Sequence, residues 1–461
     1  MSLLAAVAVP HPPILLPEIG RGEEIKIEKT AGAYRQAMSR IAALKPDTII
    51  VTSPHTVMYQ DYFHLSPGGS AEGDMRAFRA PSVKLRTDYD PEFVEVLSKL
   101  AQRDGLPAGT LGQREQSLDH GTMVPLYFLN QVYSGYRTVR IGLSGLSPLL
   151  HYRLGQCIAE AARLLDRRTV LIASGDLSHK LTPDGPYGFA PEGPVFDRQV
   201  TDALAAGDFL TLLQIPSILA NAAAECGLRS FQIMAGALDG KAVTHNLLSY
   251  EGPFGVGYGV ALFEVTGDAP ERNFGVQAET EVRNFTAACK AREDDYVRLA
   301  RLSLETYLKT GKKASLPEWL PEKMQNTRSG AFVSLKKHGQ LRGCIGTISA
   351  TRDSVAEEIL LNAISAGVSD PRFEPVSAAE LSELVYSVDI LGDAEAIDSP
   401  EKLDVKRYGV IVQNGRRRGL LLPNLEGINS VAEQILIAKQ KAGIRPEEPV
   451  DLFRFEVVRH Q

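Results

Sequence analysis

Cysteine is scarce in this sequence, and it never occurs in the close pairs that mark redox or zinc motifs. Four cysteines stand in 461 residues, at positions 157, 226, 289 and 344, and none of them belongs to a CxxC pair. This spacing argues against a disulfide framework and against a zinc site built from paired cysteines. We therefore expect reduced thiols in a cytoplasmic protein.

Long apolar runs and an excess of positive charge are also missing. No apolar run approaches the roughly 20 residues of a membrane-spanning helix, and the first residues lack the basic and apolar regions of a secretory leader. The chain has 50 basic and 56 acidic residues, a formal net charge of −6. That balance argues against binding to a nucleic-acid backbone. We expect neither a membrane nor a nucleic acid as a partner.

Alternating strand-like and helical patterns fill the first 266 residues. Because strands that alternate with helices form βαβ units, the pattern predicts an α/β domain with a mostly parallel sheet and helices on both faces. Residues 56–90 read as irregular loops that could cover a pocket. The expected strands are 3–9, 47–52, 138–143, 169–173, 243–250 and 256–265, and the expected helices are 23–44, 91–103, 123–132, 149–166, 196–213 and 216–238.

A polar segment without apolar periodicity, residues 267–283, is the expected linker between two domains. Residues 284–461 then mix hairpin and helix patterns, which predicts a separate α+β domain. Its two expected hairpins cover 331–346 and 408–422, and Asn414-Gly415 is a strong turn signal for the second. A long helix over 285–308, further helices over 354–365 and 430–441, and strands over 385–391 and 452–458 complete the expected elements.

Histidines stand just beyond the ends of three predicted strands. His11 follows Pro10, His55 follows Pro54, and His179 follows the strand that ends at Ala173. In an open α/β sheet, binding sites lie at the carboxyl ends of the strands, where these side chains would meet. His120 occupies a turn before a predicted helix. One histidine of this kind is most often a hydrogen-bonded loop residue, but together they indicate a metal or catalytic centre.

A non-haem Fe(II) centre commonly uses two imidazoles and one carboxylate and leaves other positions open. Glu225 is the candidate carboxylate, because it lies among small apolar residues in a predicted helix and a buried charge must be paired or ligated. An ordinary surface glutamate remains the alternative at this position.

Five separated motifs then carry a resemblance. The sequences His11-Pro-Pro, Ser53-Pro-His55, Asp119-His120-Gly and Ser174-Gly-Asp-Leu-Ser-His179, followed by Glu225, resemble the class III extradiol dioxygenases of the LigB type. The resemblance covers about residues 1–265. It implies Fe(II) bound by His11, His55 and Glu225, with His179 as the catalytic base and His120 orienting the substrate and O2.

Cys226 departs from that pattern. Glu225-Cys226-Gly also resembles the Memo branch of the superfamily, in which a cysteine is the third ligand. Neighbouring residues of a helix point about 100° apart, so only one of the two would face the metal. We favour Glu225, since a carboxylate suits Fe(II) in oxygen chemistry while a thiolate is softer; Cys226 is the alternative.

The second domain carries its own resemblance. Leu341-Arg-Gly-Cys-Ile-Gly346, Ser369-Asp-Pro-Arg-Phe373 and the Asn414-Gly415 hairpin resemble the AMMECR-type domain over about residues 284–461. That family occurs with Memo-like and radical-SAM proteins in the AmmeMemoRadiSam system, which implies a radical-SAM protein as a candidate partner. Cys344 is a candidate nucleophile, because the nearby Arg342 would favour its thiolate. A small cysteine flanked by glycines in a strand more often fills space in the core, and we favour that structural interpretation.

The leading hypothesis is therefore an Fe(II) enzyme of the extradiol dioxygenase type, acting on a small catechol-type or phenolic aromatic with O2. The alternative is a Memo-like metal-binding protein, with iron or zinc, that lacks dioxygenase activity and works with a radical-SAM partner. A third, non-enzymatic hypothesis treats the histidines as structural. A homo-oligomer is compatible with all three.

Overall fold

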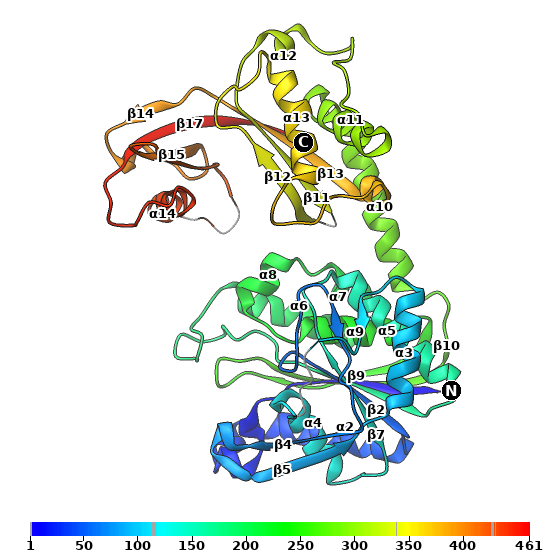
Figure 1. Cartoon of the computed structure of the whole chain (residues 1–461). Helices are drawn as coiled ribbons and strands as arrows, with labels where there is room; N and C mark the ends of the chain where they lie inside the picture. Colours follow the sequence, from blue (N-terminus) through cyan, green and yellow to red (C-terminus); the bar gives the residue numbers. More distant parts are fainter. Residues whose placement is uncertain (1, 113–116, 338, 426–427, 429) are drawn as a thin grey trace. The chain divides into compact units, whose positions relative to one another are not determined.

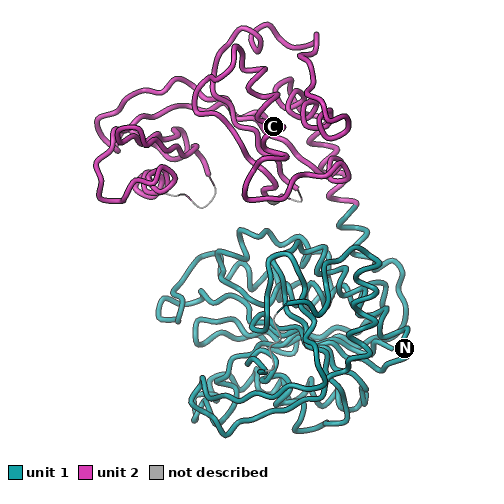
Figure 2. Tube along the Cα trace, viewed as in Figure 1, with its two compact units in different colours: residues 1–279 teal, residues 280–461 magenta. Residues whose placement is uncertain are grey.

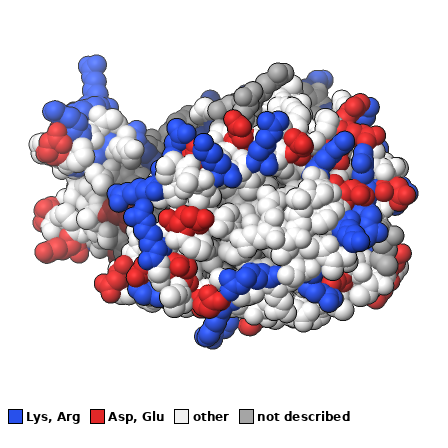
Figure 3. Space-filling view, turned by 90° about the horizontal axis from the view of Figure 1, so that it is seen from below, with Lys and Arg blue, Asp and Glu red and all other residues white. Residues whose placement is uncertain are grey.

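The protein is described here by a computed structural model covering residues 2–112, 117–337, 339–425, 428 and 430–461. The chain divides into two compact units, residues 1–279 and 280–461 (Figure 2). No helix among these residues is long and apolar enough to cross a membrane. On the face drawn in Figure 3, acidic and basic side chains are interspersed.

A six-stranded sheet organises unit 1 (Figure 1). Its order is β7-β2-β8-β1-β10-β9; the first four strands run parallel, while β10 is antiparallel to β1 and to β9. The predicted mostly parallel α/β fold is confirmed. The strands are β1 (Leu3–Val9), β2 (Thr48–Ser53), β7 (Arg137–Gly142), β8 (Thr169–Ser174), β9 (Lys241–Glu251) and β10 (Tyr258–Asp268).

Strand β1 shows why helices cover both faces of this sheet. Successive side chains of a strand point to opposite faces: Ala6 and Ala8 pack into one core and Val7 and Val9 into the other. The first core is closed by α3 (Pro91–Arg103), α5 (Pro148–Leu164), α6 (Glu192–Ala206), α7 (Phe209–Gln214), α8 (Ser217–Ala223) and α9 (Leu228–Ala237). The second core is closed by α2 (Glu28–Leu44) and α4 (His120–Asn130).

Several expected elements differ in the structure. The segment expected as loops contains the hairpin of β4 (Ser70–Met75) and β5 (Ala80–Asp88). The single helix expected over 216–238 is divided into α8 and α9, and the one over 196–213 is divided into α6 and α7 at Gly207, whose φ is +64°. The expected linker contains the first part of α10 (Phe274–Arg292). Short elements include η1 (Pro13–Leu15), α1 (Pro17–Gly20), η2 (Glu23–Ile27), η3 (Arg76–Phe78), β3 (Phe63–His64) and β6 (Ala108–Gly109).

Unit 2 is built on an antiparallel sheet of order β12-β11-β13-β17-β15-β16, with β14 also paired to β17. Both predicted hairpins are present, β11–β12 and β15–β16. The expected α+β architecture is confirmed, and the long helix expected at its start is instead two, α10 and α11. The elements are α11 (Asp295–Thr310), α12 (Glu322–Asn326), β11 (Ala331–Lys337), β12 (Gln340–Gly346), α13 (Val355–Val368), β13 (Leu384–Leu391), β14 (Glu395–Ile397), β15 (Tyr408–Asn414), β16 (Arg417–Leu421), α14 (Val431–Lys441) and β17 (Asp451–His460).

Candidate metal centre

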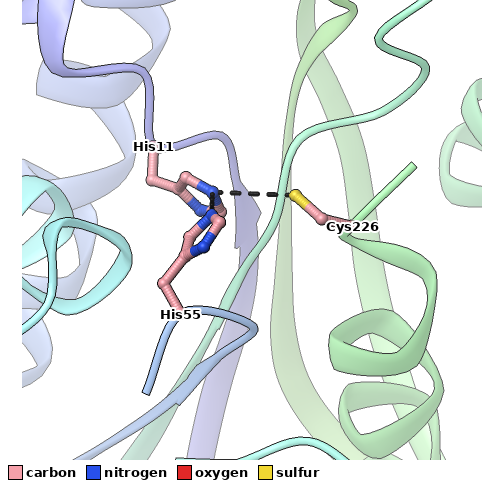
Figure 4. A group of neighbouring side chains, drawn as sticks. All are labelled: His11, His55 and Cys226. Carbon is pink, nitrogen blue, oxygen red and sulfur yellow. Dashed lines mark hydrogen bonds between the residues drawn. The ribbon is translucent and has the colours of Figure 1, made fainter. Parts of the chain in front are cut away.

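The histidines predicted to converge do so at the carboxyl edge of the parallel strands. Strands β1 and β2 end at Val9 and Ser53, and His11 and His55 follow each of them by two residues. The turn between α8 and α9 approaches the same edge and brings Cys226 to the two rings (Figure 4). The site therefore combines strand ends with one interhelical turn.

His11, His55 and Cys226 form a compact group of donors (Figure 4). Their ligand atoms all lie within 4.8 Å of one another. The two Nε2 atoms are 2.9 Å apart, and Sγ of Cys226 is 3.7 Å from Nε2 of His11. The His11 side chain is buried, whereas His55 is exposed, so the group has a closed side and an open side. Separations of this size are those expected of atoms that share one metal ion, because Zn–N and Zn–S bonds are about 2.0–2.3 Å long.

Hydrogen bonding fixes which nitrogen of His11 faces the group. The Ser174 hydroxyl donates to the carbonyl oxygen of Gly121 at 2.5 Å, so its single proton is used there. Nδ1 of His11 lies 2.9 Å from that same hydroxyl oxygen and must donate to it. The neutral ring then has its lone pair on Nε2, toward Cys226. Burial lowers the pKa of His11 to about 3, which keeps the ring neutral.

A second network holds the strand end that bears His55. The backbone N–H of His55 donates to the Ser53 hydroxyl, which in turn donates to Oδ1 of Asp119 at 2.5 Å. Asp119 also caps α4 by accepting from the backbone N–H of Thr122. The fully buried guanidinium of Arg140 lies 3.7 Å from Asp119, so the carboxylate faces a positive charge.

The turn that carries Cys226 has an unusual backbone. Ala224, the residue after α8, has a φ of +53°, a conformation that costs a non-glycine residue free energy. Gly175 lets the turn approach, because a Cβ at that position would lie 2.1 Å from Cα of Gly227. The backbone N–H of Asp176 donates to Sγ of Cys226 at 3.3 Å. In return, the backbone N–H of Cys226 donates to the carbonyl oxygen of Asp176, also at 3.3 Å. The thiol is therefore held against the end of β8.

Glu225, the preferred ligand of the sequence prediction, does not join the group. Its carboxylate accepts from the backbone N–H of Leu228 at 2.7 Å, at the start of α9. Burial raises the pKa of Glu225 to about 7. The prediction assumed a continuous helix through this segment, whereas α8 ends at Ala223 and α9 begins at Leu228. In the turn between them, Cys226 faces the histidines and Glu225 binds the next helix.

The two histidines expected to assist catalysis flank the group. Nδ1 of His179 donates to the carbonyl oxygen of Ala224, which leaves the lone pair of the neutral ring on Nε2. His179, Asp176 and Cys226 also have donor atoms within 4.8 Å of one another. The His120 ring stacks on His55, with centroids 4.1 Å apart, and burial lowers its pKa to about 3.

Comparison with known proteins gives the family. The model of the catalytic LigB subunit of aromatic ring-opening dioxygenase matches residues 5–261. The chain belongs to the LigB family. A second family model, AMMECR1, matches residues 297–460, so a LigB domain is followed by an AMMECR1 domain. The predicted fusion of these two domain types is confirmed.

Relatives of the LigB–AMMECR1 chain occur in bacteria and archaea. Protein CA_C1420 of Clostridium acetobutylicum is 43% identical to this chain over 470 aligned residues. The alignment covers 100% of both chains. A protein of Thermotoga maritima is 49% identical over 172 residues, 37% of this chain and 98% of its own length. The crystal structure of PH0010 from Pyrococcus horikoshii covers 36% of this chain and 88% of that chain, at 34% identity and a TM-score of 0.34.

The donor set in the LigB domain fits a transition-metal ion. Two neutral imidazoles and a thiol are ligands for zinc, iron or copper, and a metal-bound thiol loses its proton. Without a cation nearby, burial raises the pKa of Cys226 above that of an ordinary thiol. The short distance between the Nε2 atoms of His11 and His55 also supports a bound cation. Two nitrogen lone pairs 2.9 Å apart repel each other unless a proton or a cation lies between them.

Asp176 lies beside the donor group but was not among the site residues predicted from the sequence. Its Oδ1 accepts the backbone N–H of His11 at 2.8 Å. Burial raises the pKa of Asp176 to about 6. The available signal was its position in Ser174-Gly-Asp176, directly after a buried strand. The contact joins β8 to the loop that presents His11.

Proposed function

We propose that the LigB domain binds one metal ion through His11, His55 and Cys226 and turns over a small phenolic or catechol-type aromatic beside it. The observation that supports this most is the group of three donor atoms within 4.8 Å of one another, with a ring nitrogen of His179 also within 4.8 Å of the thiol sulfur. The third ligand is thereby revised from Glu225 to Cys226, since the carboxylate is committed to the Leu228 N–H. Fe(II) is the proposed ion, and zinc is the alternative.

His179 is the proposed base. Because Nδ1 donates to the Ala224 carbonyl, Nε2 can accept a proton from a substrate hydroxyl. A bound metal would supply positive charge that favours the ionised phenol. The ring of His120, stacked on His55 and 5.2 Å from the ring of Phe78, would bound the substrate on the other side.

Ring opening by O2 is the proposed reaction, and membership of the LigB family supports it. The test uses full-length protein loaded anaerobically with Fe(II) and mixed with a panel of catechols while O2 uptake is recorded. We expect uptake in the wild type and a loss of about 10²–10⁴-fold in the His179→Ala variant. His245→Ala is the matched control, because that exposed histidine hydrogen-bonds to Ala205 away from the group. Iron-loaded wild type without uptake on any catechol would contradict the dioxygenase proposal.

A Memo-like metal-binding role without dioxygenase activity is the second candidate. A specific observation favours it: the third donor is the thiol of Cys226, whereas a two-histidine, one-carboxylate set is typical of non-haem Fe(II) oxygenases. This candidate predicts bound metal, zinc included, without O2 uptake. It also predicts retention of a radical-SAM protein on the immobilised wild-type chain.

For the AMMECR1 domain we propose an accessory role, as a lid, a docking module or a second catalytic step. Cys344 fits a packing role better than a nucleophilic one. Its Sγ accepts from the Ser334 hydroxyl at 3.2 Å, and burial raises its pKa. A reactive cysteine needs the opposite shift. All four cysteines are free thiols, which supports the cytoplasm as the proposed location.

A further inference from the structure

An exposed tyrosine lies beside the proposed base. Tyr187 is in the segment between His179 and α6, and its ring centroid is 5.2 Å from that of His179, with the planes at 77°. The tyrosine is nevertheless 62% exposed, and Phe189, two residues on, is 53% exposed. Small-molecule sites are lined mainly by hydrophobic and aromatic side chains, together with a few placed polar groups.

The segment that carries Tyr187 is held at its base. Leu181 donates its N–H to the carbonyl of Gly255, Ala190 donates to Lys180, and Leu181 pairs with Phe189 in an isolated antiparallel bridge. Two successive turns lie between these anchors, closed by hydrogen bonds from Gly185 to Thr182 and from Gly188 to Gly185. Backbone contacts thus fix the place of Tyr187, and its exposure does not come from a frayed end.

Aromatic rings also lie beside His55, a member of the donor group. His120 stacks on His55, and Phe78, from the short helix between β4 and β5, meets His120 edge to face with centroids 5.2 Å apart. The group of His11, His55 and Cys226 therefore has Phe78 and His120 beside His55, and Tyr187 beyond His179. The aromatic ring of a phenol whose hydroxyl gives its proton to His179 would come within reach of Tyr187.

We propose that Tyr187 is a specificity-determining residue that contacts the aromatic ring of the bound substrate. The proposal rests on the proposed function, because it requires an aromatic ligand at the metal next to His179. The contact uses the face of the tyrosine ring and not its hydroxyl, which has no hydrogen bond to any residue that the structure describes. Tyr187 therefore selects planar aromatic chelators over aliphatic ones that present the same pair of oxygens.

The experiment measures ligand affinity, so it does not depend on turnover. Anaerobic, Fe(II)-loaded full-length protein is titrated with 4-nitrocatechol, followed by its absorbance, and separately with acetohydroxamate, an aliphatic chelator with two oxygens. For Tyr187→Ala we expect binding of 4-nitrocatechol to weaken by about tenfold or more, because an aromatic contact and its buried area are lost. Acetohydroxamate should bind within about twofold of the wild type, and Tyr187→Phe should match the wild type with both ligands.

Each other outcome has a separate meaning. Equal 4-nitrocatechol affinity in the wild type and Tyr187→Ala overturns the inference and leaves the metal centre intact. Equal weakening of both ligands also overturns it, since the tyrosine then acts on the metal centre as a whole. Metal-loaded wild type that binds acetohydroxamate but not 4-nitrocatechol contradicts the proposed aromatic substrate, and the inference falls with it.

Discussion

Sγ of Cys226 lies 3.7 Å from Nε2 of His11, although 215 residues separate the two in the sequence. Strand β1 delivers the histidine and an interhelical turn delivers the thiol, and β8 lies between them in the network of contacts. Ser174 and Asp176, at and just after the end of β8, bind the ring and the backbone of His11. The end of β8 is thus the part of the LigB domain that aligns the donors.

Ser174 is expected to set the tautomer of His11. In Ser174→Ala, Nδ1 of His11 loses its acceptor, so the ring no longer favours the tautomer with the lone pair on Nε2. We predict that metal affinity, measured by competition with a chelator, falls about 10–100-fold. Ser230→Ala is the control, because that buried hydroxyl donates to the backbone carbonyl of Ser174 and not to the His11 ring. Equal losses in the two variants would show that Ser174 matters only for packing.

Gly175 is expected to be essential for bringing the turn of Cys226 to the histidines. In Gly175→Ala the new methyl would lie 2.1 Å from Cα of Gly227, so the turn must move outward. We predict loss of bound metal and a decrease of about 1–3 kcal/mol in the free energy of unfolding, as for other overpacked sites. Gly69→Ala, which meets nothing within 4 Å, should change neither quantity. Full metal content in Gly175→Ala would refute this account of the turn.

Acid should destabilise the metal-free protein, and His151 gives a share that can be isolated. The His151 ring is buried, its Nδ1 donates to the Ser147 carbonyl, and burial lowers its pKa to about 3. The unfolded chain binds a proton near pH 6.5 and the folded chain does not, so stability is full above that pH and is lost toward pH 3.

The share of His151 in this loss is about 2 kcal/mol at pH 5. His151→Asn keeps a donor near the Ser147 carbonyl but cannot titrate. Urea unfolding of both proteins with a chelator, at about pH 7.5 and about pH 5, should give a smaller decrease for the variant. His11 and His120, whose pKa values are also lowered, titrate in both proteins and cancel in the comparison. Identical decreases would mean that His151 is protonated in the folded state.

The parallel core and the histidine positions were readable from the sequence for a clear physical reason. A fully buried strand is a continuous apolar run, and the run Leu3 to Val9 has the same bounds as β1. The carboxyl ends of parallel strands share one edge of the sheet. The positions of His11 and His55, each just after a predicted strand, therefore predicted that the two side chains would meet. Both hairpins of the AMMECR1 domain were equally readable, since the second is closed by Asn414 and by Gly415 with a φ of +59°.

The third donor could not be read in the same way. Alanine rarely adopts the left-handed backbone conformation that Ala224 has, so the sequence does not predict it. Residues 216–238 also have the apolar composition of one continuous helix. At the break, Gly227 approaches Gly175 closely, a tertiary contact that local propensity does not contain. Because residues 224–227 are not helical, the rotation of about 100° between neighbouring helical residues does not apply there. It therefore cannot decide whether Glu225 or Cys226 faces the histidines.

The β4–β5 hairpin was missed because its signals are interrupted. β5 alternates buried and exposed residues toward its end, but Pro81 lies near its start, and Arg79 has a φ of +62° in the connection. Proline and polar residues lower the strand propensity of the segment, while pairing with β4 provides the hydrogen bonds. The hairpin matters for the site because Phe78, which meets His120, belongs to the connection between its strands.

Metal content in matched variants tests the central claim most directly. Full-length wild type, Cys226→Ser and Glu225→Gln are loaded anaerobically with Fe(II), freed of excess metal, and analysed for iron and for folded state. The account predicts about one iron per wild-type and Glu225→Gln chain and less than about a tenth of that in Cys226→Ser, because the thiolate is a ligand and the carboxylate is not. Iron retained by Cys226→Ser and lost from Glu225→Gln, with both variants folded, would contradict it.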